Sequence, residues 1–160
     1  MIIRHPQLDE VDAIIALFED EVRAGRMLPR SAENIRVSLK DWLVADIDGM
    51  VAGCVSLVYF NERLCEVRSL AVNPAYRGNG IASQLVAAAV TMARAAGMKR
   101  VLTLTRAASL FERAGFKRDF VANFPEKVWR DCAPCPFQQA CDEVALLFDL
   151  QHSNSGKGEA

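Results

Sequence analysis

Apolar residues recur at helical spacing through the first part of the chain. Between Leu8 and Ala24 they fall on every third or fourth position, which predicts a helix with one buried face. Ser31, followed by an asparagine three residues later, is a capping signal for a second helix that runs to Lys40. Met1–His5 has the short apolar pattern of a strand. The chain therefore opens as one strand followed by two helices.

The middle of the chain has the pattern of β-strands. Two predicted strands, Trp42–Ile47 and Met50–Phe60, are joined at Asp48-Gly49, a dipeptide typical of tight hairpin turns. Leu64–Val72 is a third strand of the same run. Short turn signals separate these strands, so they are expected to form an antiparallel meander.

The pattern then returns to helix before the last strands. Helices are predicted over Gly80–Ala96 and Ala108–Ala114, with a strand at Arg100–Thr105 between them. A closing strand at Glu143–Leu150 follows a polar, cysteine-bearing loop. Because a helix crosses over from Leu64–Val72 to Arg100–Thr105, those two strands are expected to be parallel.

These elements predict an α/β (α+β) fold with a mixed, mostly antiparallel sheet and flanking helices. Residues 1–150 are expected to form a single domain, and the small polar residues 151–160 a flexible C-terminal tail. With 160 residues, of which 51% are hydrophobic and 24% charged, the chain has the composition of an ordinary globular protein.

Charge and hydropathy exclude several classes of function. The net charge is −1 and no run of lysine or arginine stands out, so neither nucleic acid nor a membrane surface is an expected partner. We find no export signal and no apolar run long enough to span a bilayer, which together predict a cytoplasmic protein.

Arg77–Ala82 follows a strand and opens a helix, which is where phosphates bind. The first N–H groups of a helix have no intrahelical partner, and Gly78 and Gly80 allow the backbone to approach an anion closely. A dinucleotide fingerprint fits poorly because its third glycine would fall at Ser83, and no P-loop lysine follows. A plain strand-to-helix turn is the alternative.

Arg77-x-x-Gly80-x-Ala82 resembles the acetyl-CoA signature of the GNAT acetyltransferase superfamily. Ser109–Phe116, a helix ending in Gly-Phe, resembles the second motif of that family. The resemblance implies an acetyl-CoA cosubstrate and a GNAT fold, in which the parallel central strands splay apart and the chain often dimerises. The residues expected to bind acetyl-CoA are Leu70, Ala71, Val72, Arg77, Gly78, Asn79, Gly80, Ile81, Ala82 and Phe111.

Acetyl transfer to an amine requires a base and an acid. The resemblance implies that Glu66, on the central strand, is the base; the alternative is a plain ion pair with Arg68 on the same strand. Phe111 stands where the superfamily usually has an acidic tyrosine, so the acid is unassigned, with Ser109 a substitute by proximity. Cys54 and Cys65 lie in apolar strands, which favours packing over an acyl-cysteine role.

A sharper resemblance is to short stand-alone N-acetylglutamate synthases, and it implies a small amino-acid substrate, L-glutamate. Matching stretches include Leu28–Ser31 and Phe124–Trp129. Two substrate carboxylates need at least two cations, for which arginine is well suited. The candidate cations, which are otherwise solvated surface charges, are Arg30, Arg68, Lys127 and Arg130. An acetyltransferase for another small amine or a protein N-terminus, or a non-catalytic acetyl-CoA sensor, remains open.

Three cysteines near the end of the chain have the spacing of metal ligands. Cys132, Cys135 and Cys141 form a C-x2-C-x5-C pattern, in which two sulfurs on one turn can bind a structural zinc ion. The fourth ligand would be Asp142, a histidine (His5 or His152) or water. Free thiols in a folded loop are the alternative.

Overall fold

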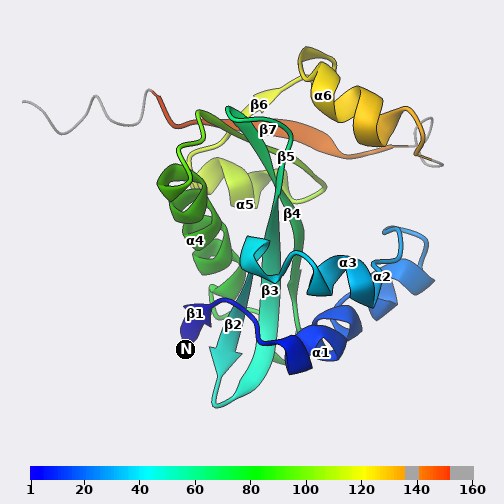
Figure 1. The fold of residues 1–160 in the computed structure, drawn as a ribbon, viewed down its shortest axis with the longest axis vertical. Coiled ribbons are helices and arrows are strands. Elements are labelled where there is room, and N and C mark those ends of the chain that lie inside the picture. The colour runs from blue at the N-terminus through cyan, green and yellow to red at the C-terminus, as the bar shows by residue number, and fades with distance from the viewer. Residues whose placement is uncertain (136–140, 152–160) are drawn as a thin grey trace, which may run out of the picture. The chain divides into compact units, whose positions relative to one another are not determined.

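The computed structural model describes residues 1–135 and 141–151 (Figure 1). Within these ranges seven strands form a mixed sheet in the order β1-β2-β3-β4-β5-β7-β6. β4 and β5 are parallel, as the crossover predicted, and the pairs β1–β2, β2–β3, β5–β7 and β6–β7 are antiparallel. From residue 152 on, the predicted C-terminal tail lies outside the described residues.

The strands are β1 (Ile2–Arg4), β2 (Trp42–Ile47), β3 (Met50–Tyr59), β4 (Leu64–Val72), β5 (Arg100–Thr105), β6 (Lys117–Asp119) and β7 (Val144–Asp149). The α-helices are α1 (Val11–Ala16), α2 (Glu19–Arg23), α3 (Ala32–Arg36), α4 (Ile81–Ala95), α5 (Ala108–Arg113) and α6 (Pro125–Lys127). Short 3-10 turns occupy Leu8–Glu10, Leu39–Asp41, Pro74–Tyr76 and Val121–Asn123, and a π-helical turn occupies Val128–Cys132.

The chain divides into two compact units. The first comprises residues 1–57 and 69–89, and the second comprises residues 58–68 and the described part of 90–160. β3, β4 and α4 each contribute residues to both units. No helix of the described residues is long and apolar enough to cross a membrane.

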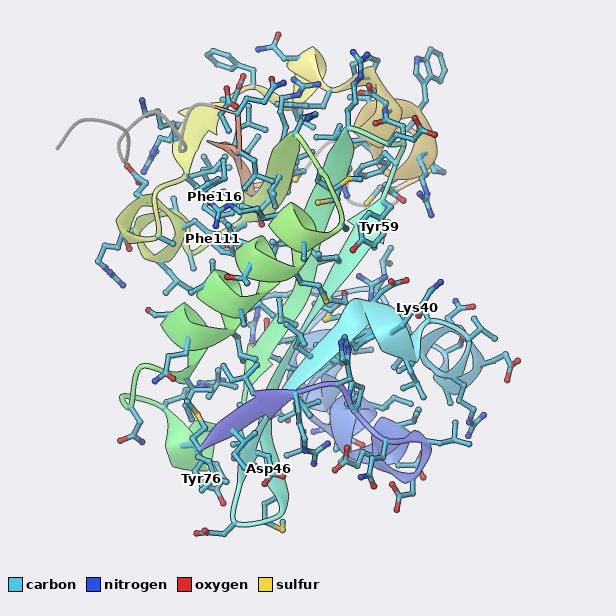
Figure 2. The ribbon with its side chains drawn as sticks, turned by 60° about the vertical axis from the view of Figure 1, so that its left-hand side comes forward. Lys40, Asp46, Tyr59, Tyr76, Phe111 and Phe116 are labelled. Atoms are coloured by element: carbon cyan, nitrogen blue, oxygen red, sulfur yellow. The ribbon has the colours of Figure 1, made fainter. Side chains whose placement is uncertain are left out.

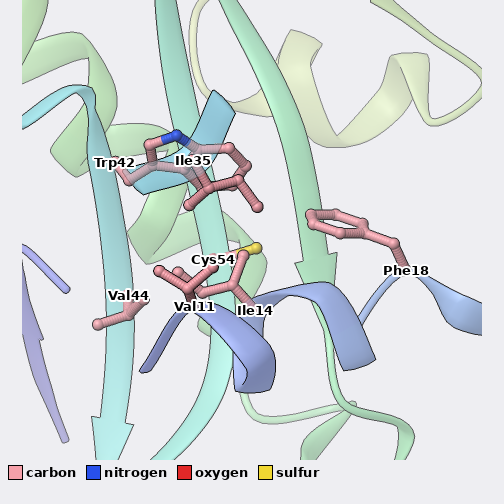
Figure 3. Packing of buried hydrophobic residues seen from close by; sticks show 7 residues of the cluster. All are labelled: Val11, Ile14, Phe18, Ile35, Trp42, Val44 and Cys54. Atoms are coloured by element: carbon pink, nitrogen blue, oxygen red, sulfur yellow. The ribbon is translucent and has the colours of Figure 1, made fainter. Parts of the chain in front are cut away.

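The predicted first helix is broken in the first unit, where Leu8–Glu10, α1 and α2 replace one continuous element. The break lies at Leu17 and Phe18, and Phe18 is only 3% exposed. Its ring meets Trp42 edge-on at 6.3 Å, inside an apolar cluster with Val11 and Ile14 (Figure 3). One continuous helix over Leu8–Ala24 was therefore the wrong prediction, and the break coincides with the buried Phe18.

The second helix is capped as predicted but is shorter. The Ser31 hydroxyl accepts a hydrogen bond from the Asn34 amide at 3.0 Å. The helix ends at Arg36 rather than Lys40, because the Ser38 hydroxyl donates to the Asn34 carbonyl at 2.7 Å and a 3-10 turn follows.

In the second unit, β5 lies between β4 and β7. Its register with β4 covers three pairs, from Leu64–Arg100 to Glu66–Leu102. Past that point the Thr103 hydroxyl, rather than a ladder amide, donates to the Val67 carbonyl at 3.2 Å. The two strands thus leave their backbone ladder one residue beyond Glu66.

The region before β7 is not the simple loop that its polarity predicted. Phe124 is 1% exposed and packs in a core with Leu64, Leu102 and Ala145. Pro125 occupies the first position of α6, where proline suits a helix start. The helical path continues through the π-helical turn to Cys132, so residues 125–132 present side chains at fixed positions.

Candidate active site

The predicted phosphate cradle, Arg77–Ala82, lies entirely in the first unit. Gly78 and Gly80 have φ angles of 85° and 74°, and a Cβ added to either would meet nothing within 4 Å. The backbone is therefore open on this side in a conformation that favours glycine. The 15-residue helix α4 begins directly afterwards at Ile81. This geometry fits the pyrophosphate of acetyl-CoA.

Side chains around the cradle fold the loop onto its own backbone. The Asn79 amide donates to the Tyr76 carbonyl at 2.9 Å, and the Arg77 guanidinium donates to the Val72 carbonyl at 3.4 Å. Asn73 caps the preceding turn by accepting from the Ala75 amide at 2.9 Å. These bonds hold the loop without using the first amides of α4.

A buried cluster of four charges lies in the second unit. Glu66 is 3% exposed and is bound by two cations. The Arg68 guanidinium grips both of its carboxylate oxygens at 3.2 Å, and Lys127 Nζ lies 3.0 Å from Oε1. Asp131 completes the cluster, 2.6 Å from Arg68 Nη2 and 3.4 Å from Lys127 Nζ. We call these four residues the charge cluster.

The charge cluster balances two carboxylates against two cations. Burial alone would lower the pKa of Arg68, but the carboxylates of Glu66 and Asp131 outweigh burial and raise it. Burial likewise works to raise the pKa of Asp131, and the charges and hydrogen bonds of Arg68 and Lys127 bring it below its usual range. Arg68 and Asp131 are consequently held in their charged forms at neutral pH.

The structure brings together three predicted site residues, Glu66, Arg68 and Lys127. The predicted alternative for Glu66, an ion pair with Arg68, is present, and it includes Lys127 as well. Asp131 was missed by the sequence argument. The sequence feature that could have identified Asp131 is its position four residues after Lys127, because residues at this spacing lie on one side of a helical turn.

The remaining predicted residues are dispersed. Ser109 is exposed on α5, whereas Phe111 is 2% exposed and meets Phe116 edge-on at 5.2 Å (Figure 2). Arg130 stacks over the Phe60 ring at 5.4 Å and donates to the Tyr59 carbonyl. Arg30 is half-buried between α2 and α3 of the first unit.

The comparison with known proteins decides the family. Residues 11–116 match the profile of the acetyltransferase (GNAT) family. The chain belongs to the GNAT family. It is thus an acetyl-CoA-dependent acetyltransferase with the GNAT fold, in agreement with its cradle and with the parallel strand pair.

Two relatives and one solved structure are similar to this chain. It is 39% identical to an uncharacterised N-acetyltransferase of Chlorobaculum tepidum, over 92% of this chain and 96% of that protein. It is 32% identical to an amino-acid acetyltransferase of Ralstonia nicotianae, over 78% of this chain but only 28% of that protein. N-acetylglutamate synthase of Neisseria gonorrhoeae, crystallised with coenzyme A and N-acetyl-glutamate, superposes with a TM-score of 0.81 at 24% identity, covering 93% and 35% of the two chains.

Two cysteines of this GNAT chain are fully buried. Cys54 and Cys65 are both 0% exposed. Burial raises the pKa of the Cys65 thiol to about 12, assisted by the charge of Glu66, and raises the pKa of Cys54 further. A thiol that stays protonated is a poor nucleophile, so neither side chain is suited to form an acyl-cysteine.

The three later cysteines do not form a visible metal site. Cys132 and Cys135 are partly buried and Cys141 is exposed. Within the described ranges, no group of three or more His, Cys, Asp or Glu side chains is placed to hold a metal ion. The predicted zinc ion therefore finds no support there, and His152, one candidate fourth ligand, lies outside the described residues.

Thiol titration tests this division of the five cysteines. With Ellman's reagent at pH 8, we expect Cys54 and Cys65 of the folded enzyme to stay unreacted, because a thiol of pKa about 12 is ionised in roughly one molecule in 10⁴. In guanidinium chloride all five should react. A fourth thiol that reacts rapidly in the folded protein would contradict the assignment.

Proposed function

We propose that this enzyme transfers the acetyl group of acetyl-CoA directly to the α-amine of L-glutamate, the N-acetylglutamate synthase reaction of arginine biosynthesis. The amino-acid acetyltransferase relatives and the N-acetylglutamate synthase neighbour support this choice of substrate. The observation that carries the proposal is the charge cluster, which places a buried carboxylate beside two cations in one unit.

In the proposed reaction Glu66 is the base. Its Oε1 accepts from both Lys127 and Arg68, whereas Oε2 accepts from Arg68. Oε2 therefore retains lone-pair capacity to take the ammonium proton of the substrate, directly or through one water. The neutral amine then adds to the thioester carbonyl and the C–N bond forms. The nitrogen gives up its extra proton to Ser109 or water, the C–S bond breaks, and Ser109 or water returns a proton to the sulfur, so that coenzyme A leaves as its thiol.

The substrate carboxylates need cations, and Arg30 is the first candidate. Its loop between α2 and α3 is held by Ser31, whose side chain caps α3 immediately afterwards. A guanidinium on such a braced loop can grip a carboxylate with two parallel hydrogen bonds. Arg68 and Lys127 are proposed for the second carboxylate, where the substrate would compete with Asp131, whose side chain is 27% exposed. Arg130, one residue before Asp131, is proposed as a further cation for the second carboxylate.

Arg30→Ala tests the glutamate assignment. We expect KM for glutamate to rise about 10- to 100-fold with a smaller change in kcat, because a charge-assisted hydrogen-bonded pair contributes about 1.5–3 kcal/mol. The measurement is thiol release from acetyl-CoA across glutamate concentrations. Arg26→Ala is the matched control, because Arg26 lies in the same loop but pairs with Glu21 at 2.8 Å. A KM within threefold of wild type for Arg30→Ala would remove the glutamate assignment.

A thiol-release screen of the twenty amino acids separates the rival activities. Turnover with glutamate above all others supports the proposal, and turnover with another amine redirects it while leaving the acetyltransferase activity intact. Tight binding of coenzyme A without turnover of any amino acid, polyamine or peptide N-terminus would instead favour a non-catalytic sensor.

A further inference from the structure

Ser69 combines two anomalies that the acetyl-CoA site does not yet explain. It lies within β4 with a φ of 59°, and the other non-glycine residue of positive φ in the described ranges is Asp48, in the hairpin turn. Its hydroxyl oxygen is buried, and no hydrogen-bond partner is found for it within residues 1–135 and 141–151. A left-handed serine inside a strand and an unsatisfied buried hydroxyl are both features that concentrate at functional sites.

The backbone at Ser69 is held in place by neighbours that do not involve its hydroxyl. The Cys54 thiol, 0% exposed, donates to the Ser69 carbonyl at 3.4 Å. Beyond Ser69, the Asn73 amide donates to the Ala52 carbonyl at 2.8 Å. β3 thus contacts the backbone at and after Ser69, and the Ser69 hydroxyl takes no part in either hydrogen bond.

Gly53 shows how closely β4 and the start of α4 lie against β3. A Cβ at Gly53 would stand 2.9 Å from the Ala71 carbonyl oxygen and 3.3 Å from Ile81, the first residue of α4. The absence of a side chain at Gly53 therefore allows both the Leu70–Val72 segment and the start of α4 to pack closely against β3. All of these contacts lie within the first unit, which also contains the whole cradle.

We propose that the Ser69 hydroxyl donates a hydrogen bond to the thioester carbonyl oxygen of acetyl-CoA and stabilises the negative charge that develops there. Ser69 directly precedes Leu70–Val72, the strand edge assigned to the cosubstrate arm. The residue as a whole is partly exposed, and no hydrogen bond retains its hydroxyl, so rotation about χ1 releases it without breaking a hydrogen bond. A donor aimed at the developing oxyanion acts in the transition state more than in the ground state.

The proposal rests on acetyl transfer by the family and not on the glutamate assignment. Its test uses whichever amine gives the fastest thiol release with the wild-type enzyme. If glutamate proves not to be the substrate, the comparison of the Ser69 variants is therefore still valid.

Ser69→Ala and Ser69→Gly separate the hydroxyl from the backbone strain. Both remove the donor, but glycine adopts a φ of 59° without strain and alanine does not. We expect both variants to lose kcat by about 10- to 100-fold while KM for acetyl-CoA stays within about threefold, because the lost bond belongs to the transition state. Ser69→Gly should unfold at the same temperature as wild type or higher.

Ligand binding gives a readout that does not depend on turnover. Coenzyme A has no acetyl carbonyl, so its Kd from calorimetry should be the same in wild type and Ser69→Gly. S-acetonyl-CoA, which keeps a carbonyl but cannot transfer an acetyl group, should bind Ser69→Gly more weakly than wild type. Full activity in both Ala and Gly variants would overturn the proposal and identify the hydroxyl as a water site. Loss of activity in Ser69→Ala alone, with Ser69→Gly fully active, would overturn it in favour of a purely conformational role.

Discussion

Replacing Glu66 with glutamine is expected to lower kcat/KM by about 10²- to 10⁴-fold, the range contributed by a positioned general base. Glutamine has nearly the same shape, so it can still accept hydrogen bonds from Arg68 and Lys127 through its amide oxygen, but it cannot take a proton from the substrate. The measurement is thiol release from acetyl-CoA between pH 6 and 10. The variant should also regain rate as the pH rises, because the substrate amine then loses its proton to solvent.

Asp131→Asn is the matched control for the loss of charge. It removes one negative charge from the same charge cluster and leaves Glu66 in place. Its activity should fall by less than about tenfold, because Asp131 acts on the reacting groups only through Arg68 and Lys127. Equal losses in the two variants would show that the cluster matters for its charge balance and that Glu66 is not the base. Circular dichroism at the assay temperature confirms that each variant is folded.

Local signals account for most of what the sequence predicted correctly. β2, β4 and β5 begin and end where the pattern placed them, and the Asp48-Gly49 turn has the positive φ angles of a tight hairpin. The cradle also follows from residue type, because glycine spacing at a helix start is a short-range feature. Such features depend on residues that are neighbours in the chain, so one sequence is enough to recognise them.

Contacts between distant residues explain what was missed. Glu66 meets Lys127 across 61 positions, and no local pattern announces which lysine would reach it. Helical residues 125–132 read as a polar loop because the buried anchor, Phe124, is a single residue whose partners come from β4 and β5. Ser69 carries no sequence signal for its left-handed backbone, whose carbonyl accepts from Cys54, 15 positions away in the chain.

Replacing Lys127 with methionine is expected to destabilise the folded protein by about 3 kcal/mol, the lower part of the range for breaking a buried ion pair. Lys127 is 8% exposed and Glu66 3%, so solvent compensates little for the lost ammonium. Arg68 still grips both oxygens of Glu66, which keeps the loss from the upper part of that range. The measurement is urea unfolding followed by both tryptophan fluorescence and circular dichroism, whose coincidence tests for a single transition.

Lys40→Met is the matched control, because it removes the same charge and adds the same side chain at an exposed site (Figure 2). It should change stability by no more than about 0.5 kcal/mol. The double variant Lys127→Met with Glu66→Gln should be more stable than the sum of the single losses implies, because no uncompensated carboxylate remains buried. Strict additivity of the two losses would contradict direct coupling between Lys127 and Glu66.

The pH dependence of the stability of Lys127→Met tests how the charge cluster sets the pKa of Asp131. A carboxyl whose folded pKa is depressed contributes stability above its unfolded pKa, and that contribution is lost as the pH falls through the folded value. In wild type, burial opposes this depression, and Arg68 and Lys127 together produce it. With Lys127 gone, Arg68 alone remains, so Asp131 should protonate at a higher pH. Acid unfolding of Lys127→Met should therefore begin at a higher pH than that of wild type, whereas an unchanged onset would place Asp131 outside the cluster's energetics.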